Sequence, residues 1–168
     1  LGHLKYSFQL RPHTVADQAY IGAYQGIGVG YFNFGNPEEL GNPLAVYLFQ
    51  GGRIAQFSPR ISLNYEWNFG ASFGWKPYDE YDNPENQIIG SKVNAYLNVN
   101  LYLKWALSPK FDLMIGTTGS HFSNGNTQYP NSGLNTVDCK VGLVYNFNRR
   151  ADELAQSWQR PIVPPFPR

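Results

Sequence analysis

The sequence predicts an all-β protein, an eight-stranded antiparallel transmembrane β-barrel. Two long segments, 61–76 and 93–107, alternate throughout between apolar or aromatic residues and polar or small ones. Strands of soluble β-sandwiches are usually about 5–6 residues long, whereas strands that cross a bilayer need about 9–11 residues and often extend further. The aromatic content of 16% and the 17 glycines fit the same class.

Seven strands can be placed by their period-two alternation. They are residues 3–11, 20–34, 44–50, 61–76, 93–107, 111–123 and 134–147. In 20–34, Gly26, Gly28 and Gly30 share one face, which suits a narrow lumen filled by long side chains from neighbouring strands. The facing of 44–50 is ambiguous, and 51–60 is expected to be a turn region. Because single-chain bacterial barrels have an even strand number, we expect an eighth strand at the N-terminal end, upstream of Leu1 or poorly defined.

The barrel is expected to occupy residues 1–147, followed by a periplasmic C-terminal tail, 148–168, with a short helix and then a Pro-rich stretch. Short turns of such barrels are periplasmic and longer loops extracellular, so 108–110 is assigned to the periplasm and 124–133 to the outside. Export to an outer membrane requires a leader, so an N-terminal segment is expected to be removed or missing before Leu1.

Composition excludes several classes of function. The net charge of +1 offers no electrostatic basis for nucleic-acid binding. The single cysteine, Cys139, excludes an internal disulfide and a cysteine-based metal site. Polar and aromatic residues expected to fill the lumen argue against a pore: Asn64, Glu66, Asn98, Tyr102 and Lys104. The aromatic residues Tyr65, Trp67, Trp75 and Trp105 are expected to form an interfacial girdle.

One polar motif stands at the end of strand 111–123. His121 and Ser123 are two residues apart, so in a strand both lie on one face, as a base and a nucleophile must. Their odd parity is that of the lipid-facing residues, and Asn135 on the last strand shares it. All three are therefore expected on the outer wall at the extracellular rim, where a lipid-like substrate would approach from the membrane. A polar interfacial rim without chemistry is the other interpretation.

The stretches SHFSNG (120–125) and PNSGLN (130–135) resemble the lipid A deacylase family of outer-membrane barrels, which is PagL-like and also labelled acyloxyacyl hydrolase. The resemblance covers roughly residues 20–147. Three further stretches within it, 26–47, 63–79 and 89–99, are similar to the Bacteroidetes branch of this family. The resemblance implies an esterase of the bacterial outer membrane that removes an acyl chain from lipid A of lipopolysaccharide, with no cofactor and no metal. It implies that His121 is the base, Ser123 the nucleophile and Asn124 part of the oxyanion hole.

The resemblance also places the family's acidic residue, a Glu that orients the His, at Asn135. Asn can accept a hydrogen bond from the imidazole but brings no charge to stabilise the imidazolium, so weaker or altered activity is expected. Asp138 is close in sequence but has inward parity.

Two other functions remain open. The barrel could be a catalytically weak or silent subunit of an envelope complex that docks through its tail, residues 149–168. It could also be a small adhesin or ligand-binding barrel acting through loops 77–92 and 124–133. The acidic side chains of the first loop are expected to be solvated rather than to collect divalent ions: Asp79, Glu80, Asp82 and Glu85.

Overall fold

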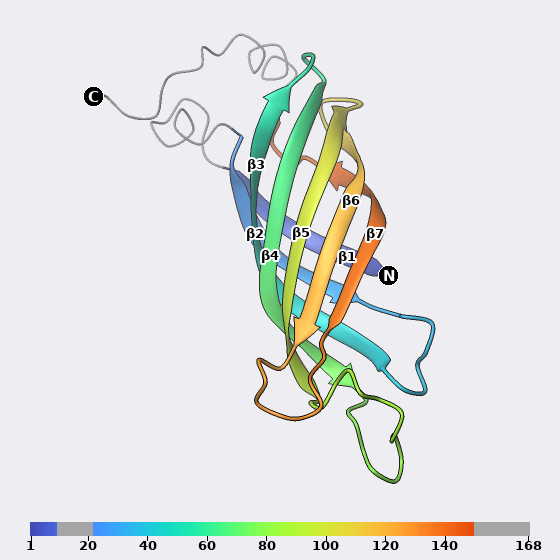
Figure 1. Cartoon of the computed structure of the whole chain (residues 1–168). Helices are drawn as coiled ribbons and strands as arrows, with labels where there is room; N and C mark the ends of the chain where they lie inside the picture. The colour runs from blue at the N-terminus through green and yellow to red at the C-terminus, as the bar shows by residue number, and fades with distance from the viewer. Residues whose placement is uncertain (10–21, 150–168) are drawn as a thin grey trace, which may run out of the picture.

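The computed structural model describes residues 1–9 and 22–149, and every regular element in these residues is a β-strand. The strands are β1 Gly2–Gln9, β2 Tyr24–Tyr31, β3 Gly41–Gln56, β4 Ile61–Trp75, β5 Val93–Ala106, β6 Phe111–Ser123 and β7 Leu134–Tyr145. Each pairs antiparallel with the next, in one seven-stranded sheet (Figure 1). Within the described ranges, no helix has the length and apolar character needed to cross a membrane.

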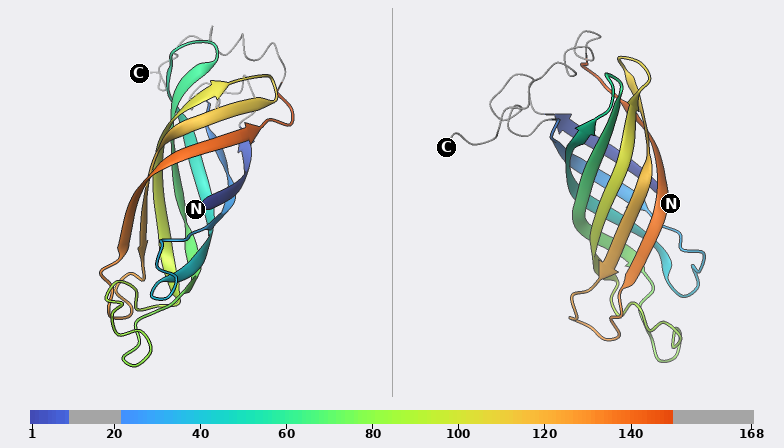
Figure 2. Two further views of the ribbon diagram at one scale, coloured as in Figure 1. Left: turned by 90° about the vertical axis from the view of Figure 1, so that its right-hand side faces the viewer. Right: turned by 45° about the horizontal axis from the view of Figure 1, so that its top comes forward.

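The sheet curls strongly, so its two edge strands approach each other (Figure 2). The ring centroids of Tyr6 in β1 and Phe147, just beyond β7, are 6.3 Å apart. The register contains no pairing between β1 and β7, and the expected eighth strand is not among the described residues. The all-β antiparallel barrel predicted from the sequence is confirmed as a curled, open sheet.

The alternation of apolar and polar residues in the sequence corresponds to the outer and lumenal faces of the sheet. Apolar residues of odd number on β4 to β7 point outward, and polar or small residues of even number point into the lumen. The glycines of β2 face inward as predicted. Aromatic rings from β3 occupy the space beside them, so these inward positions have no room for a larger side chain. A Cβ atom added to Gly28 would lie 2.4 Å from the Tyr47 ring, and one added to Gly26 would lie 2.6 Å from Phe49.

The prediction for residues 51–60 is wrong, because β3 continues to Gln56 and the turn occupies only 57–60. Gly51 and Gly52 suggested a turn but lie inside the strand. A Cβ atom on Gly51 would be 2.4 Å from the Tyr24 hydroxyl, so this glycine leaves room for a tyrosine that crosses the lumen. The facing left open for 44–50 is now defined: Leu44, Val46 and Leu48 point outward and Tyr47 inward.

Trp75 is not part of an outer girdle. It is only 3% exposed and its indole N–H donates to Ser72 Oγ at 2.9 Å inside the barrel. Gly74, with a φ of +86°, shifts the parity of the last residues of β4. The other predicted girdle residues, Tyr65, Trp67 and Trp105, do point outward.

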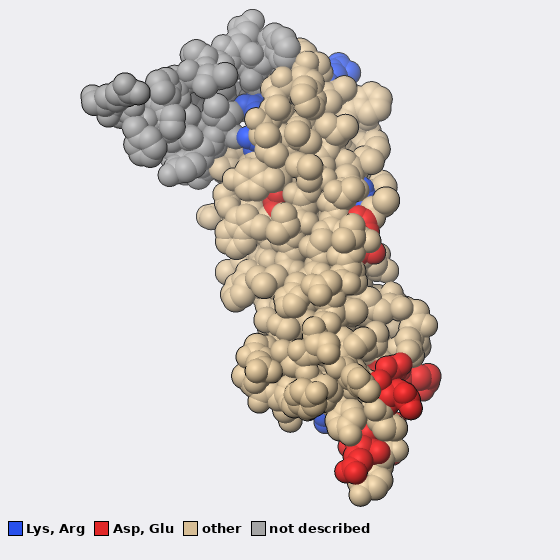
Figure 3. All heavy atoms as spheres, in the orientation of Figure 1, with Lys and Arg blue, Asp and Glu red and all other residues tan. Residues whose placement is uncertain are grey.

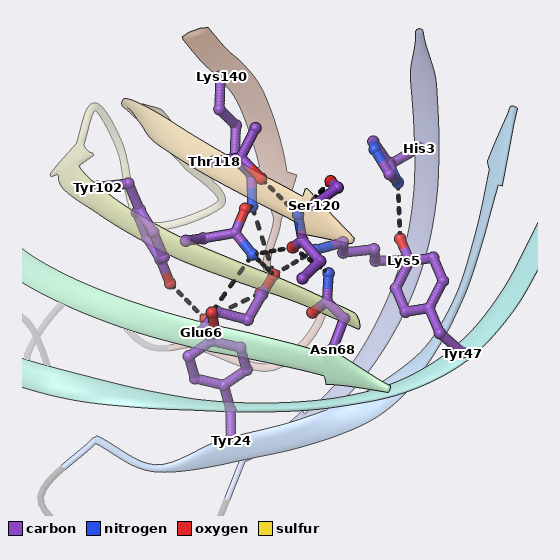
Figure 4. Close-up of polar contacts among 12 residues, drawn as sticks. His3, Lys5, Tyr24, Tyr47, Glu66, Asn68, Tyr102, Thr118, Ser120 and Lys140 are labelled. Atoms are coloured by element: carbon purple, nitrogen blue, oxygen red, sulfur yellow. Dashed lines mark hydrogen bonds and ion pairs between the residues drawn. The ribbon is translucent and has the colours of Figure 1, made fainter. Parts of the chain in front are cut away.

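The lumen is filled along its length. At its centre the buried Glu66 carboxylate pairs with Lys5 of β1 and Lys140 of β7 (Figure 4). Tyr24 donates to the same carboxylate at 3.0 Å, and Asn100 does so at 3.3 Å. Towards the end with the long loops, the lumen is closed by buried aromatic and aliphatic side chains: Phe32, Leu40, Tyr47, Phe49, Trp75, Ile89, Tyr96 and Phe122.

The connections differ in length at the two ends of the sheet. Loops 32–40, 76–92 and 124–133 gather at one end, and the turns 57–60 and 107–110 lie at the other (Figure 1). Exposed acidic side chains gather at the long-loop end (Figure 3): Glu38, Asp79, Glu80, Asp82 and Glu85. This arrangement fits the sidedness inferred from loop length.

The chain beyond β7 is fixed to the short-turn end. Arg149 pairs with Asp112 at 2.7 Å and donates to the Ser108 carbonyl at 2.6 Å. The predicted helical and Pro-rich parts of the tail, within 150–168, lie outside the described residues, as do residues 10–21. The division of the chain at residue 147 therefore stays a prediction.

Candidate active site

The motif at the end of β6 is oriented by one buried aromatic side chain. Phe122 is fully buried, and its ring centroid lies 5.0 Å from that of Phe32 and 5.1 Å from that of Trp75. Because neighbouring residues of a strand point to opposite faces, anchoring Phe122 inside the lumen turns His121 and Ser123 to the outer wall. Both are half-buried there.

The register between β6 and β7 brings Asn135 beside His121. The two residues are direct cross-strand partners, and His121 Nδ1 lies 2.7 Å from Asn135 Oδ1. An amide oxygen can only accept, so the imidazole donates through Nδ1–H. In the neutral ring Nε2 is then unprotonated and free to act as a base.

Gly133 lies between the two side chains of the motif. A Cβ atom added to it would be 3.1 Å from His121 Cε1 and 3.7 Å from Ser123 Cβ. Its φ of +72° is a further reason for glycine at this position. Both side chains lie beside Gly133, but no hydrogen bond joins Ser123 Oγ to the His121 ring among the contacts of the described residues. Any side chain at residue 133 would press on the candidate base.

Asn124, directly after Ser123, is held by loop 124–133. Its backbone N–H donates to Asn131 Oδ1 at 3.1 Å, and its Nδ2 donates to the Gln128 carbonyl at 2.7 Å. Its Oδ1 is buried, without a partner in the part of the chain that the structure describes. One of the two Nδ2 hydrogens is therefore the free donor that this side chain retains.

The neighbouring long loop braces loop 124–133. Gly133 donates its N–H to the Ile88 carbonyl at 3.2 Å, and Ser132 Oγ donates to the Gln87 carbonyl at 3.1 Å. A Cβ atom on Gly90 would lie 2.5 Å from the Pro130 carbonyl oxygen, so the two loops pack backbone against backbone. The site is thus built on a strand end and a supported loop.

The outer wall around the motif is apolar. Leu97 of β5 is the other cross-strand partner of His121 and is 45% exposed. Nearer the middle of the barrel, Val99 and Val137 flank Gly119 from either side, with exposed fractions of 65% and 85%. The polar motif therefore borders directly on a lipid-facing surface.

Residues 1–9 and 22–149 contain no group of three His, Cys, Asp or Glu side chains placed to hold a metal ion. In the acidic loop, Asp79 Oδ1 accepts the backbone N–H of Tyr81 at 2.9 Å and that of Asp82 at 3.1 Å. These two hydrogen bonds lower the pKa of the exposed Asp79 carboxyl. Asp138 points inward, as its parity predicted, and accepts a hydrogen bond from Thr136.

The fold and the outward placement of His121 and Ser123 put this protein in the class of membrane-type barrels whose polar site faces the lipid. Comparison with protein families makes the assignment specific. The family model described as lipid A 3-O-deacylase (PagL) matches residues 3–144, so the chain belongs to the PagL family. It is an outer-membrane protein of the lipid A deacylase class, as the sequence motifs predicted. Comparison with curated proteins and with solved structures gave no match.

Sequence reasoning placed His121, Ser123 and Asn135 on one outer face, and the structure brings the His and the Asn into contact. It assigned no role to Asn131 or Gly133. The only available signal was their position in the PNSG stretch that carries the family resemblance. The chemical roles of His121, Ser123, Asn124 and Asn135 stay predictions.

Proposed function

We propose that this chain hydrolyses an ester-linked acyl chain of lipid A by Ser/His catalysis at the extracellular rim of the barrel. The observation that carries the proposal is the 2.7 Å contact from His121 Nδ1 to Asn135 Oδ1, which sets the imidazole tautomer on the lipid-facing wall beside Ser123. A side chain that served only as a polar rim would not need a partner that fixes its tautomer.

The reaction is an acyl transfer in two steps. His121 Nε2 takes the proton of Ser123 as Oγ attacks the ester carbonyl, and the tetrahedral intermediate expels the lipid A hydroxyl, which receives that proton. Water then attacks the acyl-serine with His121 again as base, releasing a fatty acid. Contacts between a serine and its base often tighten only when substrate is bound, which suits the separated pair in this structure.

Asn124 supports the negative charge that develops on the carbonyl oxygen. Its Nδ2 has one hydrogen that Gln128 does not use, and it follows the nucleophile directly in the chain. Asn135 orients the imidazole and holds its tautomer but adds no charge to stabilise the imidazolium. The proposed enzyme therefore works with less electrostatic assistance than one with a carboxylate at residue 135.

The substrate enters from the outer leaflet. Leu97, Val99 and Val137 give the acyl chain an apolar wall below the motif, while the sugar headgroup stays at the level of loop 124–133. Entry from the membrane side is supported by Phe122 and its buried aromatic neighbours, which occupy the lumen behind the motif.

The test is mass spectrometry of lipid A from cells that express the chain, its Ser123→Ala variant or neither. Loss of one acyl chain is expected with the wild type alone, with the activity of Ser123→Ala reduced by at least about 10³-fold. Thr117→Ala is the matched control, because Thr117 is exposed on the same face of β6 but lies away from the motif. Identical lipid A from wild-type and Ser123→Ala cells would contradict the proposal. Unchanged lipid A in all cells would favour a catalytically silent barrel, which the uncharged Asn135 also suits.

A further inference from the structure

One buried amide joins two of the long loops near the motif. The Asn86 side chain is 0% exposed. Its Nδ2 donates to the backbone carbonyls of Glu39 and Lys76, at 3.2 and 2.8 Å. Its Oδ1 accepts the backbone N–H groups of Ile88 and Ile89, both at 3.0 Å. Two donors and two acceptor sites are therefore in use, which is the full capacity of an amide side chain.

The stretch that Asn86 holds is the one that contacts the loop of the motif. Carbonyl groups of residues 87–88 accept hydrogen bonds from Ser132 Oγ, at 3.1 Å, and from the Gly133 N–H, at 3.2 Å. Gly133 in turn lies beside the candidate base and nucleophile. A continuous path of contacts therefore leads from the buried amide to the two reacting side chains.

We propose that Asn86 is a positioning residue for the reaction: by fixing residues 87–90 it keeps Gly133 in place beside the base and the nucleophile. This inference rests on the proposed function. None of the four hydrogen bonds of the Asn86 side chain reaches either group, so its effect is transmitted by the backbone of the two loops. A displacement of about 1 Å in reacting groups can cost about 10²-fold in rate.

The same loop offers a matched control, Asn83. Its Nδ2 donates to the same two carbonyl groups as that of Asn86, at 2.9 and 3.4 Å. In the described part of the chain, its side chain forms no hydrogen bond with the stretch 87–90. Asn83→Ala therefore removes hydrogen bonds to the same two carbonyls as Asn86→Ala but leaves the stretch beside the motif held.

Gly90 allows the path to be broken at a second point. A Cβ atom there would lie 2.5 Å from the Pro130 carbonyl oxygen, so Gly90→Ala forces the two loops apart without removing a hydrogen bond of Asn86. If the two residues act along one path, the double variant Asn86→Ala/Gly90→Ala loses less than the sum of the single losses. Independent effects would add.

The experiment measures hydrolysis of lipid A by the purified full chain in detergent micelles. Rates are normalised to the folded fraction, given by the mobility of unheated samples in gel electrophoresis. We expect Asn86→Ala and Gly90→Ala each to lower kcat by about 10²-fold. KM should change by less than about threefold, because the apolar wall on β5 and β7 is untouched. Asn83→Ala should keep kcat within about threefold of wild type.

A conservative variant and a measurement without substrate complete the test. Asn86→Asp keeps the oxygen that accepts the Ile88 and Ile89 N–H groups, so its kcat should stay within about tenfold of wild type. Backbone hydrogen exchange in residues 130–135 should become faster in Asn86→Ala and Gly90→Ala but not in Asn83→Ala.

The inference is wrong if folded Asn86→Ala keeps kcat within about threefold of wild type, or if Asn83→Ala loses as much as Asn86→Ala. Should Asn86→Ala not fold, a loss in Asn86→Asp as large as that in Gly90→Ala would overturn it. If the wild type shows no hydrolysis that depends on Ser123, the proposed function fails first. Faster exchange in Asn86→Ala would then show a contact between loops that has no catalytic role.

Discussion

At the scale of single residues, the contact between His121 and Asn135 defines the chemistry open to the site. An amide orients and fixes the imidazole but leaves the imidazolium without a counter-charge. In the proposed mechanism the pair therefore combines a base in the right tautomer with weak electrostatic support, and the two effects can be separated by substitution.

Two substitutions of Asn135 should act in opposite directions. Asn135→Ala removes the acceptor, frees the imidazole to rotate and is expected to lower kcat by about 10²-fold. Asn135→Asp keeps the size and the acceptor and adds a charge, so kcat should rise by about tenfold or more, given that the reverse change in a serine protease triad costs about 10⁴. Steady-state hydrolysis of lipid A measures both. A fall in kcat for Asn135→Asp would show that the site is adapted to a neutral partner.

The sequence predicted part of this site and could not predict the rest. The spacing of His121 and Ser123 fixes a common face once the strand is known, and Asn135 follows from parity and family resemblance. The Asn131 contact arises from a loop that folds back on itself, with Asn126 and Gly125 at φ of 64° and 65°. No periodic pattern encodes such a return, so the residue could be found only in three dimensions.

At the scale of elements, β2 and β3 show how glycine and aromatic residues share the lumen. Gly28 faces the Tyr47 ring, and the Tyr47 hydroxyl lies 2.9 Å from His3 Nδ1 (Figure 4). The ring is 2% exposed and packed on several sides, so it cannot yield to an added methyl group without losing these contacts.

Gly28→Ala is therefore expected to destabilise the barrel by about 1–3 kcal/mol through overpacking. Gly119→Ala is the matched control for stability, because a Cβ atom there would meet only the Thr136 carbonyl oxygen, at 3.9 Å. Its effect should stay within about 0.5 kcal/mol. Urea unfolding in lipid vesicles, followed by tryptophan fluorescence, compares the two. Equal stability of both variants would mean that Tyr47 has room to move.

Strand boundaries show where alternation fails as a guide. The alternation predicted the outward residues of β5 to β7, and those of β4 as far as Phe73, correctly, because each strand carries a long pattern. The alternation failed at Gly51, which leaves room for the Tyr24 side chain inside the lumen and is not part of a turn. It also failed at Trp75, where the positive φ of Gly74 reverses which face the next residue points to. Both errors come from glycines whose role depends on a partner strand.

At the scale of the whole molecule, Glu66 connects the two edges of the sheet. It stands on β4 and is 2% exposed, and it pairs with Lys5 from β1 and, at 3.3 Å, with Lys140 from β7. The sequence placed Glu66 in the lumen, but its partners depend on how far the sheet curls. Polar filling was predictable from parity, whereas the convergence of both edge strands on one carboxylate was not.

Glu66→Gln should destabilise the barrel by about 3–5 kcal/mol, because it leaves two lysines buried without their counter-charge. Adding Lys140→Met should recover part of this loss, since one unpaired cation is then removed. Glu85→Gln, the same change on an exposed loop side chain, is the control and should be near neutral. Unfolding midpoints in vesicles compare five proteins: the wild type, Glu66→Gln, Lys140→Met, the double variant and Glu85→Gln. Strictly additive losses in the double variant would show that the lysines do not depend on Glu66.

The position of Glu66 also bears on the order in which the barrel assembles. Lys5 comes from the first strand and Lys140 from the last, so the complete ion cluster forms only after β7 has joined the sheet. Contacts between segments so distant in sequence are slow to form, because the intervening chain must first be ordered. A sheet that lacks β7 can hold only one of the two cations, Lys5, beside Glu66. Addition of the last strand therefore completes the ion cluster, and the same strand brings Asn135 beside His121.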